Sequence, residues 1–207
     1  MESSPKQRWQ APGTGAWYEE RRWSHAGRRR RDPALVGALL GELLPQRDAL
    51  VLDAPCGTGR LRETVEAHGC FVGLEISASM LARARMGAGD RLVRGDVERL
   101  PFRDRAFAAV VCCRLLHHLR TRSELVRALA ELVRVSDGPV LASFWDAGSL
   151  EAWSGRWGLA RRARHRVEHD KSLVEAAVEE AGARVVRWRH SLRFLSRQTW
   201  LVAERRA

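Results

Sequence analysis

The stretch from Leu50 to Gly59 constrains the fold of this chain more than any other. Apolar residues that predict a strand run straight into an acid, Asp53, and then into a turn that contains Gly57 and Gly59. Because glycine has no Cβ, the backbone of such a turn can approach a ligand closely. A second acid, Glu75, ends the next apolar run, at the spacing from which a carboxylate accepts hydrogen bonds from ribose hydroxyls in parallel-sheet proteins. The pattern predicts a site for a nucleoside-containing cofactor.

The turn departs from the dinucleotide fingerprint. That fingerprint reads G-x-G-x-x-G, whereas the third glycine is replaced here by Arg62. Asp53 also stands just ahead of the turn, where its carboxylate would repel a pyrophosphate and attract a cationic ligand. A cationic cofactor is therefore favoured over NAD.

Apolar runs and helical patterns alternate along the chain. Strands are predicted at about 49–53, 70–75, 91–94, 106–113 and 139–145, with helices at about 60–67, 78–86 and 123–135 between them. A first helix is expected to begin at Asp32, as an N-cap followed by Pro33, and a later helix covers Lys171 to Ala181. Two closing strands follow at Arg184–Trp188 and Thr199–Glu204. This alternation predicts an α/β protein with a parallel sheet and helices on both faces.

Several motifs, in order and at family spacing, resemble those of class I S-adenosylmethionine-dependent methyltransferases. Residues 50–59 resemble motif I, and Gly73-Leu74-Glu75-Ile76-Ser77 resembles motif II. Arg94-Gly95-Asp96-Val97 and Leu100-Pro101-Phe102 resemble the G-D-x-x-x-L-P-F segment, and Leu116-His117-His118-Leu119 the loop after the fourth strand. The similarity covers roughly residues 49–145 and is nearest to the group that includes ubiquinone and menaquinone C-methyltransferases.

This resemblance implies a Rossmann-like, seven-stranded, mostly parallel sheet whose last strand is antiparallel, with S-adenosylmethionine as cofactor. Motif I would hold the amino-acid end, Glu75 the ribose and Asp96 the adenine. The cofactor-binding residues implied are Asp53, Ala54, Pro55, Cys56, Gly57, Gly59, Glu75, Ile76, Asp96, Val97 and Arg114. Pro55 departs from the family, since it replaces the usual first glycine and removes one N–H donor.

His117 and His118 are the candidate catalytic residues, because in the family the methyl acceptor lies beside this loop. Either imidazole could take a proton from an acceptor, or both could only shape the pocket. His165 and His169 are four residues apart but have no third ligand nearby, so no metal site is predicted. Cys112 and Cys113 are expected to be buried and inert, while Asp146 either faces the acceptor or caps the next helix.

The activity implied is methyl transfer to a small-molecule acceptor, anionic or aromatic. One alternative is a tRNA or RNA methyltransferase of the kind that modifies a wobble uridine, because those enzymes share the L-P-F and His-His segments. RNA is kept as a partner but is not favoured. The other alternative is a cofactor-binding subunit without catalysis.

Charge separates the ends of the chain from its centre. Residues 33–150 carry 15 basic and 14 acidic side chains, whereas residues 1–32 carry 8 and 4, and residues 151–207 carry 13 and 7. A basic cap over residues 1–31 and a methyltransferase domain over residues 32–207 are therefore expected. The basic flanks either steer an anionic acceptor or reflect a general bias towards arginine, since only residues 6 and 171 are lysine. Trp153 and Trp157 are candidates for stacking on an acceptor, whereas Trp188 and Trp200 are expected in the core.

The remaining composition bears on the compartment. No run approaches the ~20 apolar residues of a membrane helix, and residues 1–10 are too polar for a signal peptide. The four cysteines show no C-x-x-C spacing. A cytoplasmic protein without a membrane span is therefore predicted.

Overall fold

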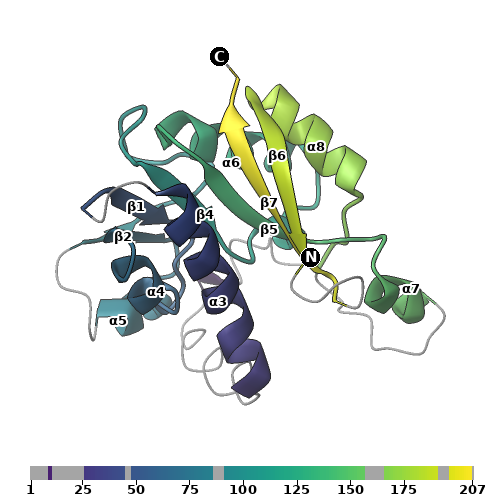
Figure 1. Ribbon diagram of the computed structural model, residues 1–207, viewed down its shortest axis with the longest axis horizontal. Coiled ribbons are helices and arrows are strands. Elements are labelled where there is room, and N and C mark those ends of the chain that lie inside the picture. Colours follow the sequence, from purple (N-terminus) through teal and green to yellow (C-terminus); the bar gives the residue numbers. More distant parts are fainter. Residues whose placement is uncertain are drawn as a thin grey trace.

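A seven-stranded sheet forms the centre of the molecule in the computed structural model, which describes residues 9–10, 26–44, 48–85, 91–156, 166–190 and 196–206. The strands are β1 (Leu50–Asp53), β2 (Cys70–Glu75), β3 (Leu92–Arg94), β4 (Ala109–Cys112), β5 (Val140–Trp145), β6 (Ala183–His190) and β7 (Gln198–Arg205). Their order is β3-β2-β1-β4-β5-β7-β6 (Figure 1). β1 to β5 pair in parallel, and β7 is antiparallel to both β5 and β6. The predicted sheet, with its antiparallel last strand, is confirmed.

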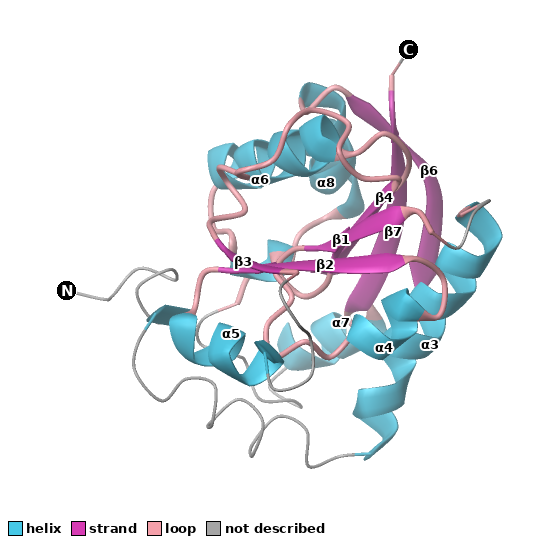
Figure 2. Ribbon diagram, turned by 90° about the vertical axis from the view of Figure 1, so that its left-hand side faces the viewer, coloured by secondary structure: helices cyan, strands magenta, loops and turns pink. Residues whose placement is uncertain are grey.

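Helices cover both faces of this sheet (Figure 2). They are α3 (Ala26–Leu43), α4 (Arg62–Glu66), α5 (Ala78–Arg85), α6 (Arg122–Val135), α7 (Leu150–Arg156) and α8 (Lys171–Glu180), with a 3₁₀ turn, η1, at Leu116–His118. Leu129 of α6 and Val178 of α8 belong to the core on one face, while Leu40 of α3 and Leu81 of α5 belong to the core on the other. Burial on both faces explains why the central strands read as continuous apolar runs.

The first predicted helix begins earlier than expected. α3 starts at Ala26 and contains Pro33, so Asp32 is not its N-cap. The carboxylate of Asp32 pairs instead with Arg60 and Arg114, and these tertiary contacts outweigh the local Asp-Pro signal. α3 also runs across the predicted boundary between residues 31 and 32, and a separate cap over residues 1–31 stays a prediction.

A capping box fixes the start of α6. Thr121 Oγ1 accepts from the Glu124 N–H at 3.2 Å, and Glu124 Oε2 accepts from the Thr121 N–H at 2.9 Å. We expect Thr121→Ala to lower the free energy of unfolding by about 1 kcal/mol, because the Glu124 N–H loses its side-chain hydrogen-bond acceptor. Urea unfolding followed by circular dichroism measures this change. Thr121→Ser keeps the hydroxyl and should recover most of the loss, and equal losses for both variants would contradict the capping role.

All four cysteines are free thiols. Among the described helices, none has the length and apolar character needed to span a membrane.

Candidate functional site

The turn after β1 brings the first predicted site residues to the carboxyl end of the sheet. Gly57 and Gly59 have φ values of +59° and +80°, a region that residues with a Cβ rarely adopt. A Cβ on Gly57 would meet nothing within 4 Å, whereas one on Gly59 would lie 3.4 Å from the Cβ of Ala84 in α5. Gly57 therefore leaves open space beside the turn, whereas Gly59 is favoured by its positive φ, because a Cβ there would only make an ordinary contact with α5.

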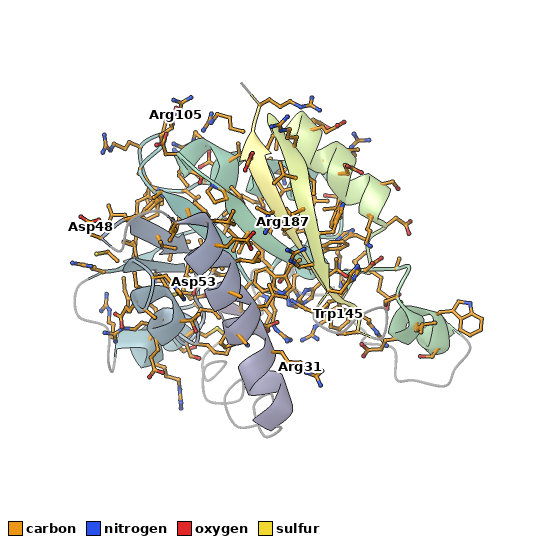
Figure 3. All side chains as sticks on the ribbon, viewed as in Figure 1. Arg31, Asp48, Asp53, Arg105, Trp145 and Arg187 are labelled. Atoms are coloured by element: carbon orange, nitrogen blue, oxygen red, sulfur yellow. The ribbon has the colours of Figure 1, made fainter. Side chains whose placement is uncertain are left out.

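Asp53 ends β1 as a buried carboxylate at the base of this turn. Its side chain lies inside the molecule, whereas Asp48 lies at the edge (Figure 3). Burial raises the pKa of Asp53 from 3.8 to about 8, although the positive charge of Arg60 opposes this rise and the charge of Glu75 adds to it. Asp53 Oδ1 is buried without a hydrogen-bond partner. A group placed this way is stabilised by a positively charged ligand.

Glu75 ends β2 and holds the same turn from the neighbouring strand. Its Oε2 accepts from the Gly57 N–H at 3.0 Å, and its Oε1 accepts from the Ser77 N–H at 2.8 Å. Burial raises the pKa of Glu75, and these backbone donors oppose that rise. The carboxylate is thus fixed in orientation on the wall of the site.

Asp96 follows β3 and supplies the third acid of this sheet edge. Its Oδ1 accepts from the Glu98 N–H at 3.0 Å, and the next residue, Val97, is buried in the core. Asp53, Glu75 and Asp96 therefore lie at the ends of three adjacent strands, as the parallel register of β1, β2 and β3 requires.

An open cavity of about 120 Å³ collects most of the predicted residues. Those that line it are Asp53, Pro55, Cys56, Gly57, Glu75, Ile76, Asp96, Val97, Arg114 and His118. Ala54 and Gly59 are not among the lining residues: Ala54 is fully buried, and Gly59 packs on α5. Sequence reasoning missed Trp9, Arg60, Met80, Glu98, Leu115 and Leu119, which also line the cavity.

The missed residues differ in the signal that they offered. Arg60 follows Gly59 directly, so its position beside the predicted turn could have been inferred from the sequence. Met80 and Leu119 look like ordinary core residues in sequence. Trp9 is far from every motif, and only the structure brings it next to His118, with ring centroids 5.1 Å apart.

The two candidate histidines occupy different environments in η1. His118 lines the cavity and remains 8% exposed. His117 is fully buried and stacks on Trp145, with ring centroids 4.8 Å apart and an interplanar angle of 15°. The guanidinium of Arg166 also lies over the Trp145 ring, 4.6 Å from the ring centroid. Of these two histidines, His118 therefore lines the cavity and His117 does not.

Of the other candidates, Asp146 and His169 do not line the cavity, whereas Cys113 does. His169 is buried, and its Nε2 lies 3.0 Å from the carbonyl oxygen of Leu116, while His165 is outside the described residues. Among the residues that the structure describes, no three potential metal ligands gather. Asp146 accepts from the Gly148 N–H at 2.9 Å in the turn into α7. Burial raises the pKa of Cys113 to about 12, so this thiol stays protonated at neutral pH.

The tryptophans separate as their sequence context indicated. Trp200 is fully buried in the core, and Trp188 is half-buried with its ring edge-on to Phe144 at 5.8 Å. Trp153 on α7 is 54% exposed. Trp157 lies outside the described residues, so its stacking on an acceptor stays a prediction.

Comparison with known proteins gives consistent matches. Residues 51–137 match a family model described as a methyltransferase domain. Malonyl-[acyl-carrier protein] O-methyltransferase of Pectobacterium atrosepticum is 40% identical over 69% of this chain and 58% of its own length. A tRNA (carboxymethyluridine(34)-5-O)-methyltransferase of Arabidopsis thaliana is 32% identical over 58% of this chain and 30% of its own length. The chain spans less than two thirds of the length of these relatives.

A solved structure shares the whole fold. Magnesium protoporphyrin IX methyltransferase from Synechocystis PCC 6803, crystallised with S-adenosylhomocysteine, has a TM-score of 0.75 at 20% identity. The alignment covers 97% of this chain and 98% of that one. The likeness therefore includes both ends of the sheet.

Proposed function

We propose that this chain, which carries the domain of the class I methyltransferases, a family that uses S-adenosylmethionine, transfers a methyl group to a small-molecule acceptor. The observation that carries the proposal is the buried Asp53 carboxylate, with an unpartnered Oδ1 and a raised pKa, on the wall of a cavity. Such a group favours a cation over a pyrophosphate. The nearer grouping with ubiquinone and menaquinone C-methyltransferases stays a prediction.

The residues of the cavity fit this cofactor. Asp53 offers a negative charge to the ammonium and sulfonium groups, and Glu75 offers fixed carboxylate oxygens to ribose hydroxyls. Asp96 stands at the third strand end, where it can accept from an adenine amino group. Ile76, Met80 and Val97 supply the apolar surface that a purine ring requires.

Catalysis then needs little more than positioning. When bound, S-adenosylmethionine supplies a methyl group activated by a positive sulfonium. Trp9, Leu115 and Leu119 provide apolar walls that exclude water and suit an aromatic or apolar acceptor. His118 is the described histidine on this wall, so we assign it the contact with the acceptor.

Calorimetric titration with S-adenosylmethionine, S-adenosylhomocysteine and NAD tests the proposal. We expect micromolar binding of the first two and no binding of NAD. Glu66→Gln should bind these ligands as the unaltered protein does, because this exposed residue pairs with Arg62 on α4 outside the cavity. A preference for NAD would overturn the proposal.

RNA methylation is the second candidate, because a tRNA methyltransferase is among the relatives and both flanks of the sequence are basic. A radiolabelled methyl donor offered with aromatic and carboxylate small molecules, or with total tRNA, separates the two. Transfer to tRNA that weakens steeply with salt would favour RNA. Binding of cofactor without transfer to any acceptor would favour a non-catalytic subunit.

The two histidines should separate in their effects. His118→Asn is expected to lower kcat/KM by about 10- to 100-fold, since it alters the wall that faces the acceptor. His117→Asn should lower the melting temperature more than His118→Asn does, because it removes a buried ring stacked on Trp145. Steady-state kinetics and thermal unfolding of both variants measure this. A larger kinetic loss in the His117 variant, at equal stability, would contradict the assignment.

A further inference from the structure

Helix α3 lies outside the strand-turn motifs, but it reaches the cavity through one buried acid. Asp32 is 1% exposed, and its Oδ2 accepts from two arginines that are distant in sequence. Arg60 Nη1 lies 3.1 Å from this oxygen, and Arg114 Nε lies 2.8 Å from it. Because both guanidinium groups contact the same oxygen atom, they lie side by side.

Both arginines line the cavity from different loops. Arg60 follows the turn after β1, and its Nη2 donates to Cys113 Sγ at 3.1 Å. Arg114 follows β4 and has a φ of +63°, a left-handed conformation that costs energy for a residue with a long side chain. Its N–H donates to Ser143 Oγ at 2.8 Å, which holds this conformation. An arginine kept in such a conformation at a cavity wall indicates a role for its side chain.

Asp32 is ionised in this environment. Burial alone would raise its pKa, but the charges and hydrogen bonds of Arg114 and Arg60 together hold the pKa below its ordinary value. Asp32 Oδ1 is buried without a hydrogen-bond partner, so Oδ2 alone makes the contacts with the two guanidinium groups. Held in one orientation, a planar guanidinium recognises a carboxylate through paired N–H donors.

We propose that Asp32 is a positioning residue that holds Arg60 and Arg114 together as a carboxylate-binding pair on the cavity wall. The inference rests on the proposed function, which supplies two sources for the carboxylate: the amino-acid end of the cofactor, or an acidic acceptor. The pair complements the three strand-end acids, because those acids recognise the cationic and hydroxyl groups of the same ligands. The lining of the cavity thus contains both acidic and basic side chains.

The test compares Asp32→Asn with Glu42→Gln, a matched control on the same helix. Glu42 also pairs with an arginine, Arg187 of β6, at 2.6 Å, but both partners are partly exposed and neither lines the cavity. Calorimetry measures the affinities of each variant for S-adenosylhomocysteine and for its decarboxylated analogue. A second set of titrations adds benzoate or neutral benzamide to protein saturated with S-adenosylhomocysteine.

If the pair binds the cofactor carboxylate, Asp32→Asn should weaken S-adenosylhomocysteine about tenfold and the decarboxylated analogue less than about twofold. If it binds an acceptor carboxylate, the variant should instead weaken benzoate and leave benzamide unchanged. Glu42→Gln should alter none of these affinities. An equal loss for charged and neutral ligands, or no loss at all, would overturn the inference.

Arg114→Gln gives an independent route should the Asp32 variant fold poorly. It should show the same selectivity for carboxylate ligands, and adding Asp32→Asn to it should cause little further loss, since Asp32 acts through the arginines. Additive losses would overturn the positioning role. Failure of the unaltered protein to bind S-adenosylhomocysteine would instead refute the proposed function itself.

Discussion

Replacing Asp53 by asparagine is expected to weaken S-adenosylmethionine binding by about 10- to 100-fold and, at the same time, to raise the melting temperature of the ligand-free protein at alkaline pH. The loss of affinity follows from removing the negative charge that faces the cation. The gain in stability follows from removing a carboxylate that burial penalises. One substitution should therefore separate function from stability.

The pH dependence of this gain has a definite sign. The pKa of Asp53 rises from 3.8 to about 8 on folding, so the folded state holds a proton that the unfolded state has released between these values. The free energy of unfolding contributed by Asp53 therefore falls as the pH rises through that window. Asparagine does not titrate. The difference in melting temperature should grow from pH 5 to pH 8 and level off above.

Scanning calorimetry of both proteins across this pH range measures the effect. Asp48→Asn is the control, because Asp48 is exposed on the approach to β1 and lies at the edge of the molecule (Figure 3). A difference in melting temperature for Asp53→Asn that does not change with pH would show that burial does not penalise the charge of Asp53.

Glu75→Gln should have the larger effect on the cofactor, a loss of affinity of more than about 100-fold. The carboxylate accepts from the N–H groups of Gly57 and Ser77 through its two oxygens. An amide turns an NH₂ group towards one of these donors, which leaves that donor unpaired and releases the turn. The ribose would also lose a charged acceptor.

Titration with S-adenosylhomocysteine measures this loss, with the exposed Glu66→Gln as the matched control. Glu75→Asp keeps the charge but shortens the side chain, so it should recover little of the affinity if geometry matters as proposed. Unchanged affinity in Glu75→Gln would contradict the role of Glu75 and leave the turn as a structural element.

Much of the fold was predictable because its signals are local. Apolar runs that end in an acid or a turn located β1 and β2, and α6 and α8 follow from apolar periodicity bounded by caps. β4 is shorter than the predicted 106–113, since Phe107 forms only an isolated bridge with Ser136. The bounds of α7 were not predicted. Asp146 was one candidate to cap that helix, but Ser149 Oγ accepts from the Ala152 N–H at 3.2 Å and takes that position.

The parts of the site that sequence did not predict depend on tertiary contacts. The Asp-Pro pair at 32–33 carries the local pattern of a helix start, but ion pairs with Arg60 and Arg114 decide where Asp32 lies. Two adjacent histidines read alike in sequence. Only the 3₁₀ turn and the stacking on Trp145 distinguish the one that faces the cavity.

The strand order also separates, along the sequence, the three acids of the site from the other residues that line the cavity. The order in which strands are added to the sheet reverses at β1: β2 and β3 lie to one side of it and β4 lies to the other. The three acids come from β1, β2 and β3, a continuous stretch of about fifty residues, whereas Trp9 and His118 approach from beyond it. Substitutions at Trp9 and His118, the residues proposed to face an acceptor, can therefore accumulate while the three acids are kept. In a chain with this topology, the proposed substrate-binding residues can change while the proposed cofactor-binding residues stay the same.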